Sequence, residues 1–246
     1  MDVVRGKQKK VFNDSLGNNL PSLVAAAHEL KSPLALVRQL SLTLEGGDIS
    51  LSDQKKILRQ ISLTSERALR LTNDLTRSAR LADAMFVMEP INPQQLCEDI
   101  VYELAPLFSA SDKNMRLKSH KHPLLLVANR DLLRRIIMSF SDNALHYTGS
   151  DSAVEIQIKA FNSGKMIRLG VRDYGPALSS DMWRSLKGKL SNSNMPINAR
   201  PQSSGLGLYI ASQFASAMNG NIGVIRHRDG ATFYVDLQAS KQLSLL

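Results

Sequence analysis

The sequence predicts an α+β protein in which a long helical hairpin precedes an α/β sandwich. Apolar residues recur at three- and four-residue intervals over the first third of the chain, as on one face of a helix. Beyond about residue 94, helical periods mix with the alternation of strands, and this order implies helices on one face of a sheet. We expect a basic segment over 1–14, the hairpin domain over 15–87 and the sandwich over 88–240.

Composition excludes several classes of protein. The 246 residues are 43% hydrophobic and 22% charged, as in an ordinary globular protein, and no apolar run approaches the roughly 20 residues that span a bilayer. Residues 1–19 lack the apolar core of a secretory signal. The single cysteine, Cys97, excludes an internal disulfide and a multi-cysteine metal site. These features suit a reducing cytoplasm.

The net charge of +9 indicates an anionic partner. Nucleotide phosphates, an acidic protein and a membrane surface fit this charge equally well. Aromatic residues make up only 5% of the chain, which is too few for an obvious base-stacking platform. We therefore expect no nucleic-acid partner.

The hairpin is predicted in detail by its turn and caps. A helix over residues 12–45 meets the turn Gly46-Gly47-Asp48, and Ser52 or Asp53 can cap a second helix that reaches about Met85. Each arm is about 45 Å long at about 1.5 Å per residue. Apolar faces of this length favour a homodimer in which two hairpins form a four-helix bundle. The alternative is an intramolecular pair of helices packed on the second half of the chain.

The second half begins after residues 89–93, whose two prolines favour a short linker. Residues 173–204 are polar and rich in turn formers, and we expect a loop there. The other predicted elements are helices over 94–108, 130–146 and 206–218, and strands over 115–119, 124–128, 154–160, 166–171, 222–226 and 231–237.

His28 lies beside the apolar stripe of the first helix, so its imidazole should reach solvent. Glu29 follows it and can accept an imidazole proton. Pro33 lacks the N–H that would bond to the carbonyl of Glu29, so the helix should bend there. The pattern favours a reactive histidine; the alternative is a solvated His–Glu pair where one helix ends.

Two polar motifs stand out in the second half. Asn143 lies at the polar end of an otherwise apolar helix, where its amide oxygen could join a hydrated Mg²⁺, or could equally form a helix cap or local bond. Asp173 follows a predicted strand and could accept an adenine amino proton, while Gly175 would let the base approach the backbone. The alternative is an ordinary Asp-x-Gly turn.

A third motif, Gly205-Leu206-Gly207-Leu208, runs directly into a helix. Glycines at a helix start leave backbone N–H groups free to face phosphates. Two glycines alone are a weak signal, but this pair follows the two polar motifs in order.

Together these motifs resemble those of the transmitter part of bacterial sensor histidine kinases, over residues 11–237. Residues 28–33 resemble the phosphoacceptor box, and residues 142–148 the asparagine box. Asp173-x-Gly175 and residues 205–208 resemble the two glycine boxes. The resemblance implies a dimerisation and histidine-phosphotransfer hairpin before an ATP-binding fold of the Hsp90, gyrase, MutL and histidine-kinase type.

The resemblance also implies the chemistry. ATP would phosphorylate His28, with Glu29 taking its proton, and an aspartate of a response-regulator receiver domain would receive the phosphoryl group. Asn143 would hold Mg²⁺, Asp173 the adenine amino group, and Tyr147 would lie against the base. The remaining contacts would be His146, at the position of a phosphate-binding lysine, residues 205–208, and a lid over residues 177–204.

Phosphatase activity would depend on Ser32, which stands where the family commonly has Thr or Asn, and we expect it to be weak. The location would be cytoplasmic, either as a soluble protein or as the cytoplasmic part of a membrane-anchored kinase whose sensor lies outside this chain.

Several positions depart from the family pattern and favour weak nucleotide binding. Ser139 replaces an asparagine, Ala177 and Ser203 replace glycines, and Pro176 stiffens the turn after Asp173. In the lid Trp183 is the one aromatic residue, and its cations are either phosphate contacts or solvated charges: Lys187, Lys189 and Arg200.

Two rival interpretations follow. One is a degenerate family member that binds nucleotide and a regulator with little or no kinase activity. The other is a scaffold that uses its basic surface to associate with DNA or a membrane.

Overall fold

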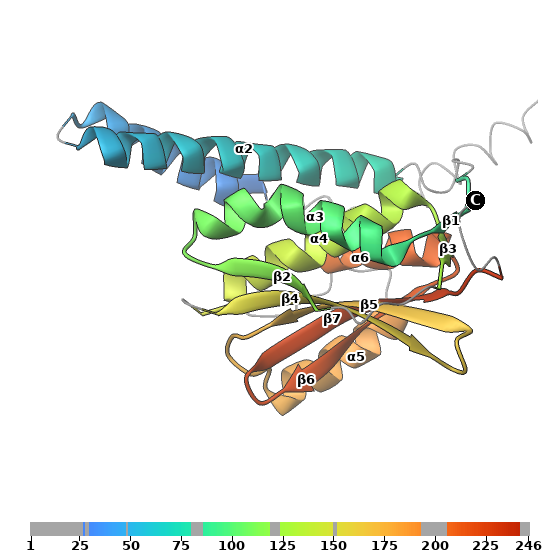
Figure 1. Ribbon diagram of the computed structural model, residues 1–246. Helices are drawn as coiled ribbons and strands as arrows, with labels where there is room; N and C mark the ends of the chain where they lie inside the picture. Colours follow the sequence, from blue (N-terminus) through green and yellow to red (C-terminus); the bar gives the residue numbers. More distant parts are fainter. Residues whose placement is uncertain are drawn as a thin grey trace, which may run out of the picture.

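The computed structural model of the chain consists of a helical hairpin and an α/β sandwich (Figure 1). It describes residue 27 and residues 30–47, 49–79, 86–118, 124–149, 152–192 and 206–241. We call residues 30–79 the hairpin and residues 86–241 the sandwich.

The hairpin pairs a helix over residues 30–45 with helix α2 (Leu51–Ala79). The first helix ends at the expected turn, where Gly47 has a φ of 81°. The N-cap of α2 is Ser50, not the predicted Ser52 or Asp53. The Asp53 N–H donates to Ser50 Oγ (3.1 Å), and the Ser50 hydroxyl donates to the Asp53 carboxylate (2.7 Å), so the two residues form a reciprocal cap. None of the helices in the described ranges is long and apolar enough to cross a membrane.

The sandwich is built on a five-stranded sheet in the order β2-β4-β5-β7-β6. Strand β2 runs parallel to β4, and the remaining neighbours are antiparallel. In spatial order the strands are β2 (Asn114–Lys118), β4 (Ala153–Phe161), β5 (Met166–Asp173), β7 (Gly230–Gln238) and β6 (Asn221–His227).

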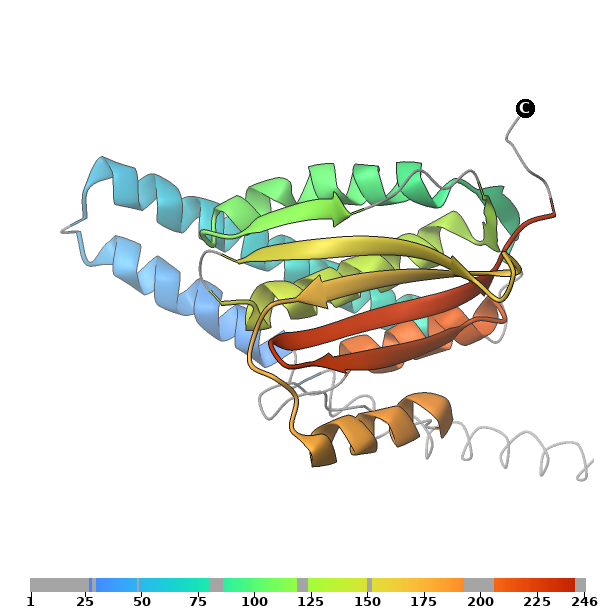
Figure 2. The same cartoon turned by 60° about the horizontal axis from the view of Figure 1, so that its bottom comes forward.

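Three helices cover one face of this sheet, as predicted: α3 (Pro93–Ser109), α4 (Arg130–Tyr147) and α6 (Leu206–Ala217) (Figure 2). Asparagine side chains cap the first two: Asn92 accepts from the N–H groups of Gln94 and Gln95, and Asn129 from that of Leu132. The core between helices and sheet contains fully buried phenylalanines at positions 108, 140 and 214.

Two elements were not expected. Residues predicted as a linker form strand β1 (Glu89–Ile91), which pairs antiparallel with β3 (Leu126–Ala128), because the extended backbone favoured by Pro90 also suits a two-stranded edge. Within the predicted loop, α5 (Ser180–Asn192) packs beside β6. Its Leu186 and Leu190 are buried, four residues apart on one helical face.

The carboxyl half of α2 packs on the sandwich. Leu71 and Leu75 contact its core, and an antiparallel series of ion pairs joins α2 to α4. The pairs are Arg67 Nε to Asp142 Oδ2 (3.8 Å), Asp74 to Arg135, and Arg77 Nη1 to Asp131 Oδ2 (3.4 Å). The less favoured alternative, packing of the hairpin on the second half, is therefore found for this part of α2.

Candidate functional site

The three motifs of the second half meet along the carboxyl-terminal half of α4. The Gly149 N–H, just past α4, donates to the Tyr174 carbonyl just past β5 (3.3 Å). A Cβ on Gly175 would lie 2.1 Å from the Tyr147 carbonyl oxygen, so glycine is required there. A Cβ on Gly207, in the first turn of α6, would lie 3.0 Å from Ser139 Oγ on α4. Segments far apart in sequence thus form one site between the sheet and its helices.

Asp173 is the last residue of β5 and faces the helix-covered side, where it is only 2% exposed. Its Oδ1 accepts the Ala231 N–H (3.3 Å) from the neighbouring strand β7. A Cβ on Gly175 would lie 3.4 Å from the same oxygen, so the carboxylate lies beside the point where Gly175 meets the Tyr147 carbonyl. A carboxylate can accept a hydrogen bond from the amino group of a base, and this role for Asp173 stays a prediction.

Near the end of α4, the side chain of Asn143 is half-buried and forms no hydrogen bond with another described residue. The cap or local bond considered as an alternative is therefore not seen in the described part of the chain. Its neighbour His146 is exposed, with its ring edge-on to the half-buried Tyr147 ring at 5.0 Å between centroids.

An amide oxygen with no local partner is a ligand that Mg²⁺ accepts, provided that phosphates and waters complete its shell. Among the described residues, no group of three or more His, Cys, Asp or Glu side chains could hold a metal ion by itself. The residues therefore fit a metal that arrives with a nucleotide, with Asn143 as the protein ligand.

Two side chains near the carboxyl end of α4 had no role predicted from the sequence, although Thr148 belongs to the motif of residues 142–148. The Thr148 hydroxyl is buried with no hydrogen-bond partner among the described residues, although it directly follows Tyr147. An unpaired buried hydroxyl costs free energy, so it is a candidate contact for a polar ligand. Lys113 Nζ donates to the Leu145 carbonyl (2.6 Å) and so closes the carboxyl end of α4; burial lowers the pKa of this lysine.

The last motif contributes backbone rather than side chains. Leu206 and Leu208 are buried in the core, so a ligand would meet only their backbone, while Gly207 is half-buried at the start of α6. Gly205 lies outside the described residues, as do His28 and Glu29. Ser32 is exposed on the first helix of the hairpin.

The lid cations are placed in part. Lys187 Nζ lies 5.4 Å from the centroid of the Trp183 ring, and both residues belong to α5. The side chain of Lys189 and the whole of Arg200 are beyond what the structure describes. The phosphate contacts considered for the lid therefore stay a prediction.

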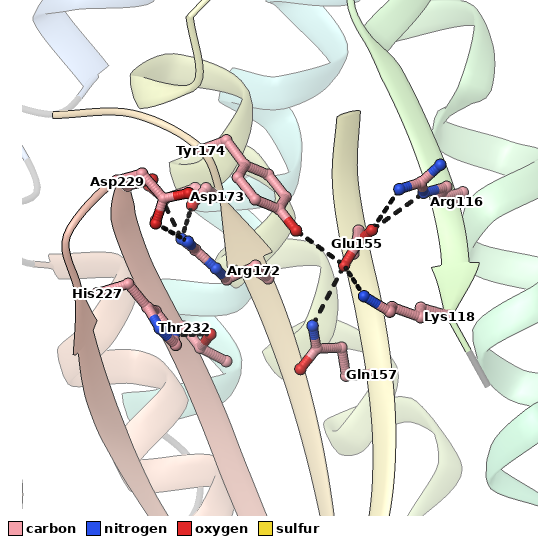
Figure 3. Close-up of polar contacts among 10 residues, drawn as sticks. All are labelled: Arg116, Lys118, Glu155, Gln157, Arg172, Asp173, Tyr174, His227, Asp229 and Thr232. Atoms are coloured by element: carbon pink, nitrogen blue, oxygen red, sulfur yellow. Dashed lines mark hydrogen bonds and ion pairs between the residues drawn. The ribbon is translucent and has the colours of Figure 1, made fainter. Parts of the chain in front are cut away.

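A polar network lies on the opposite face of the sheet around Glu155, which is paired across the strands with Arg172, the residue before Asp173 (Figure 3). Glu155 of β4 is buried and accepts hydrogen bonds from Arg116 (2.5 and 3.1 Å), Tyr174 Oη (3.1 Å) and Gln157 (3.3 Å). Burial raises the pKa of Glu155, but these bonds and the charge of Lys118 outweigh it and lower the pKa below its ordinary value. The sequence signal was weak: charged residues at alternate positions of two strands.

Residues 128–241 match the family model described as histidine kinase-, DNA gyrase B- and HSP90-like ATPase. Curated relatives extend the match into the hairpin. Sensor protein kinase PmrB of Pseudomonas aeruginosa is 30% identical over 210 residues, which is 83% of this chain and 42% of that protein. Histidine protein kinase SaeS of Staphylococcus epidermidis is 25% identical over 217 residues, or 86% of this chain and 61% of that protein. The chain thus spans only part of these relatives.

Solved structures share the fold. ShkA, solved full-length with AMPPNP, has a TM-score of 0.58 at 20% identity, over 89% of this chain and 46% of that one. Acinetobacter baumannii histidine kinase AdeS has a TM-score of 0.55 at 16% identity, over 86% and 97% of the two chains. Histidine kinase ThkA, solved with response regulator protein TrrA, has a TM-score of 0.61 at 12% identity, over 98% and 69%. The matched domain and these sequence relatives make the chain similar to two-component sensor histidine kinases.

Proposed function

We propose that this chain is a kinase core that transfers the γ-phosphoryl group of Mg-ATP to His28 and then to an aspartate of a response-regulator receiver domain. The observation that carries the proposal is the meeting of Asn143, Asp173 with Gly175, and Gly207 along the carboxyl-terminal half of α4. The relatives named as sensor kinases and the neighbour solved with AMPPNP support the same assignment.

In the nucleotide site, the Asp173 carboxylate accepts a hydrogen bond from the adenine amino group, and Gly175 lets the segment after β5 approach the Tyr147 carbonyl at the edge of the base site. The Thr148 hydroxyl supplies a further polar contact near the base. Backbone N–H groups at the start of α6 face the phosphates. Mg²⁺, held by Asn143, would neutralise phosphate charge during transfer.

The nucleophile is the neutral imidazole of His28, which is abundant near pH 7 because its reference pKa is about 6.5. A P–N bond forms as the bond between the γ-phosphorus and the ADP oxygen breaks. Glu29 accepts the ring N–H proton as the ring becomes cationic. The resulting phosphoramidate passes its phosphoryl group to the receiver aspartate.

The acceptor region works as a homodimer in this proposal, with residues 15–87 as the dimerisation and phosphotransfer domain and residues 88–240 as the catalytic domain. Six hairpin leucines are exposed in the single chain, which supports a second copy packed on the hairpin: Leu34, Leu36, Leu42, Leu51, Leu58 and Leu69. Exposed Ser32 would orient water for weak phosphatase activity. The cytoplasm is the expected location.

The second candidate function is nucleotide and regulator binding without kinase activity. It is favoured by Ser139, which stands where the family usually has an asparagine. A Cβ on Gly207 would lie 3.0 Å from Ser139 Oγ, so this serine borders the start of α6. The structure adds nothing in favour of the DNA or membrane scaffold: the basic arm of residues 5–10 lies outside its description.

Incubation with γ-labelled ATP and Mg²⁺ tests the proposal. Wild type should incorporate label, and His28→Ala should lose it while still binding nucleotide. Labelling of the alanine variant would refute the acceptor assignment. Wild type that binds ATP and never incorporates label would favour the second candidate.

A further inference from the structure

Arg172 lies next to Asp173 on β5 but faces the opposite side of the sheet (Figure 3). Its side chain is only 6% exposed, and its guanidinium reaches past the strand end. Nη1 donates to the carbonyl oxygen of Asp173, and Nη2 donates to the Asp229 carboxylate in the turn between β6 and β7. One guanidinium thus ties the backbone of the base-binding residue to a neighbouring turn.

That turn is pressed against Asp173. Gly230 has a φ of 128°, and a Cβ there would lie 2.2 Å from the Asp173 carbonyl oxygen and 2.7 Å from Oδ1. The next residue, Ala231, donates its N–H to the same Oδ1 (3.3 Å). A shift of the turn therefore moves the donor that orients the Asp173 carboxylate.

A second set of contacts holds the other side of Arg172. Its guanidinium lies 4.3 Å from the centroid of the Tyr174 ring, and the Tyr174 hydroxyl donates to buried Glu155. The Tyr174 carbonyl in turn accepts the Gly149 N–H beyond α4. Arg172 therefore stands between the turn and the segment that lines the base site.

His227 is part of the same surroundings. Its Nε2 lies 2.8 Å from Thr232 Oγ1, and burial together with the charge of Arg172 lowers its pKa, against opposing effects of Asp229 and Asp173. These surroundings therefore favour the neutral form of the imidazole beside Arg172.

We propose that Arg172 is a positioning residue for base recognition: by joining the Asp173 carbonyl to Asp229, it fixes the direction of the Asp173 carboxylate. This inference rests on the proposed function, in which that carboxylate reads the adenine amino group. Arg172 itself faces away from the base site and acts through its neighbours.

The chain offers a matched control on the same strand. Arg168 donates to both oxygens of Asp236 (2.7 Å each) and lies 3.6 Å from the centroid of the Tyr234 ring. Like Arg172, Arg168 contacts a carboxylate and a tyrosine ring on this face of the sheet, but its partners lie on β7. It does not touch Asp173. Loss of Arg168 therefore removes comparable stabilising contacts and should not change recognition of the nucleotide base.

The test compares affinities for ATP and for inosine triphosphate, which carries a carbonyl in place of the adenine amino group. Wild type should prefer ATP, and Asp173→Asn should lose the preference. Arg172→Gln should reduce the ATP-to-ITP ratio by about tenfold, or about 1.4 kcal/mol, because the carboxylate is no longer oriented. Arg168→Gln should keep the wild-type ratio even where it lowers the unfolding midpoint.

A second variant outside strand β5 keeps the test decisive if Arg172→Gln does not fold. Asp229 is on a surface turn with its side chain 65% exposed, and Asp229→Asn should lower the ratio in the same direction by a smaller factor. Arg172→Lys should give an intermediate ratio, since an ammonium group cannot reproduce the two-sided fork. If both Arg172→Gln and Asp229→Asn keep the wild-type ATP-to-ITP ratio, the inference about Arg172 is wrong, while the proposed function is unaffected. If wild type itself shows no preference for ATP, the proposed recognition of adenine by Asp173 is also wrong.

Discussion

The sandwich and the hairpin bury their apolar residues in different ways. In the sandwich Phe140 is 1% exposed and lies 6.1 Å from the Phe233 ring between centroids, whereas Leu51 and Leu58 of the hairpin are 77% and 57% exposed. The sandwich completes its own core from a sheet and three helices. In the hairpin, Leu71 and Leu75 near the end of α2 contact the sandwich core, and both are only partly buried. The difference agrees with the proposals that one chain forms the nucleotide site and that the acceptor region packs on a second copy.

The largest expected effect breaks the core of the sandwich. Phe140→Ala should lower the free energy of unfolding by about 3–5 kcal/mol, because it removes a fully buried ring and leaves a cavity. Chemical denaturation of dilute protein measures it. Leu58→Ala is the hairpin counterpart: it should change monomer stability by less than about 0.5 kcal/mol and weaken self-association in sedimentation experiments. Equal losses of stability in the two variants would contradict the comparison.

The next effect concerns the close packing of Gly175 at the edge of the base site. Gly175→Ala should weaken ATP binding by about tenfold or more, because its Cβ would meet the Tyr147 carbonyl oxygen and force strand and helix apart at a cost of about 1–3 kcal/mol. Titration with a fluorescent nucleotide measures it. Gly46→Ala in the hairpin is the control: its Cβ would lie no closer than 3.6 Å to its described neighbours, so binding should not change. Unchanged affinity in Gly175→Ala would move the base site elsewhere.

A smaller effect follows from the buried carboxylate behind the site. Glu155→Gln should cost about 1–3 kcal/mol at pH 7, because Arg116 and Lys118 lose their charged partner. The folded-state pKa of Glu155 is lowered, so its stabilisation is present above the unfolded value near 4.5 and is lost as the pH falls through the folded value. The two proteins should therefore converge in stability below about pH 4.5 in urea titrations.

Exposed Glu89→Gln on β1 is the control for that pH series and should stay within about 0.5 kcal/mol of wild type. A difference between wild type and Glu155→Gln that is constant from pH 7 to strong acid would show that the charge of Glu155 does not stabilise the fold.

The smallest effect tests the contact between the two regions. Asp74→Ala removes a partly buried ion pair with Arg135 and should release the end of α2 at a cost of about 1 kcal/mol. Amide hydrogen exchange should rise over residues 67–79 and stay unchanged over α3. Lys56→Ala breaks an exposed pair within α2 and should leave exchange in that region at the wild-type rate. Identical exchange in both variants would mean that Leu71 and Leu75 hold α2 alone.

Much of the fold follows from local patterns. Helix α4 and the two antiparallel hairpins of the sheet were predicted because their apolar periods and turn residues agree. Helix α5 was missed because its polar first turn resembles a loop, and its buried leucines are visible as a face only once β6 is beside it. The docking of α2 depends on Arg67, Asp74 and Arg77 meeting charges on α4 in register, which no local pattern contains.

The site divides in the same way. Asn143, Asp173 and Gly175 could be predicted as site residues because each has a local signature; the structure brings their segments together, and their roles stay predictions. Arg172, Glu155 and the Thr148 hydroxyl were not found, since their importance arises from cross-strand register and burial. The acceptor residues His28 and Glu29 lie outside the described ranges, so their roles stay predictions.

The central claim is that ATP bound by the sandwich phosphorylates His28, which precedes the hairpin residues in the sequence. Mass spectrometry at neutral to alkaline pH tests it most directly, on protein incubated with Mg-ATP and digested with trypsin. The expected peptide spans residues 11–31 and contains one histidine. The account predicts phosphate on His28 that is lost after brief acid treatment; acid-stable phosphate on a serine of that peptide, or phosphate on another histidine, would contradict it.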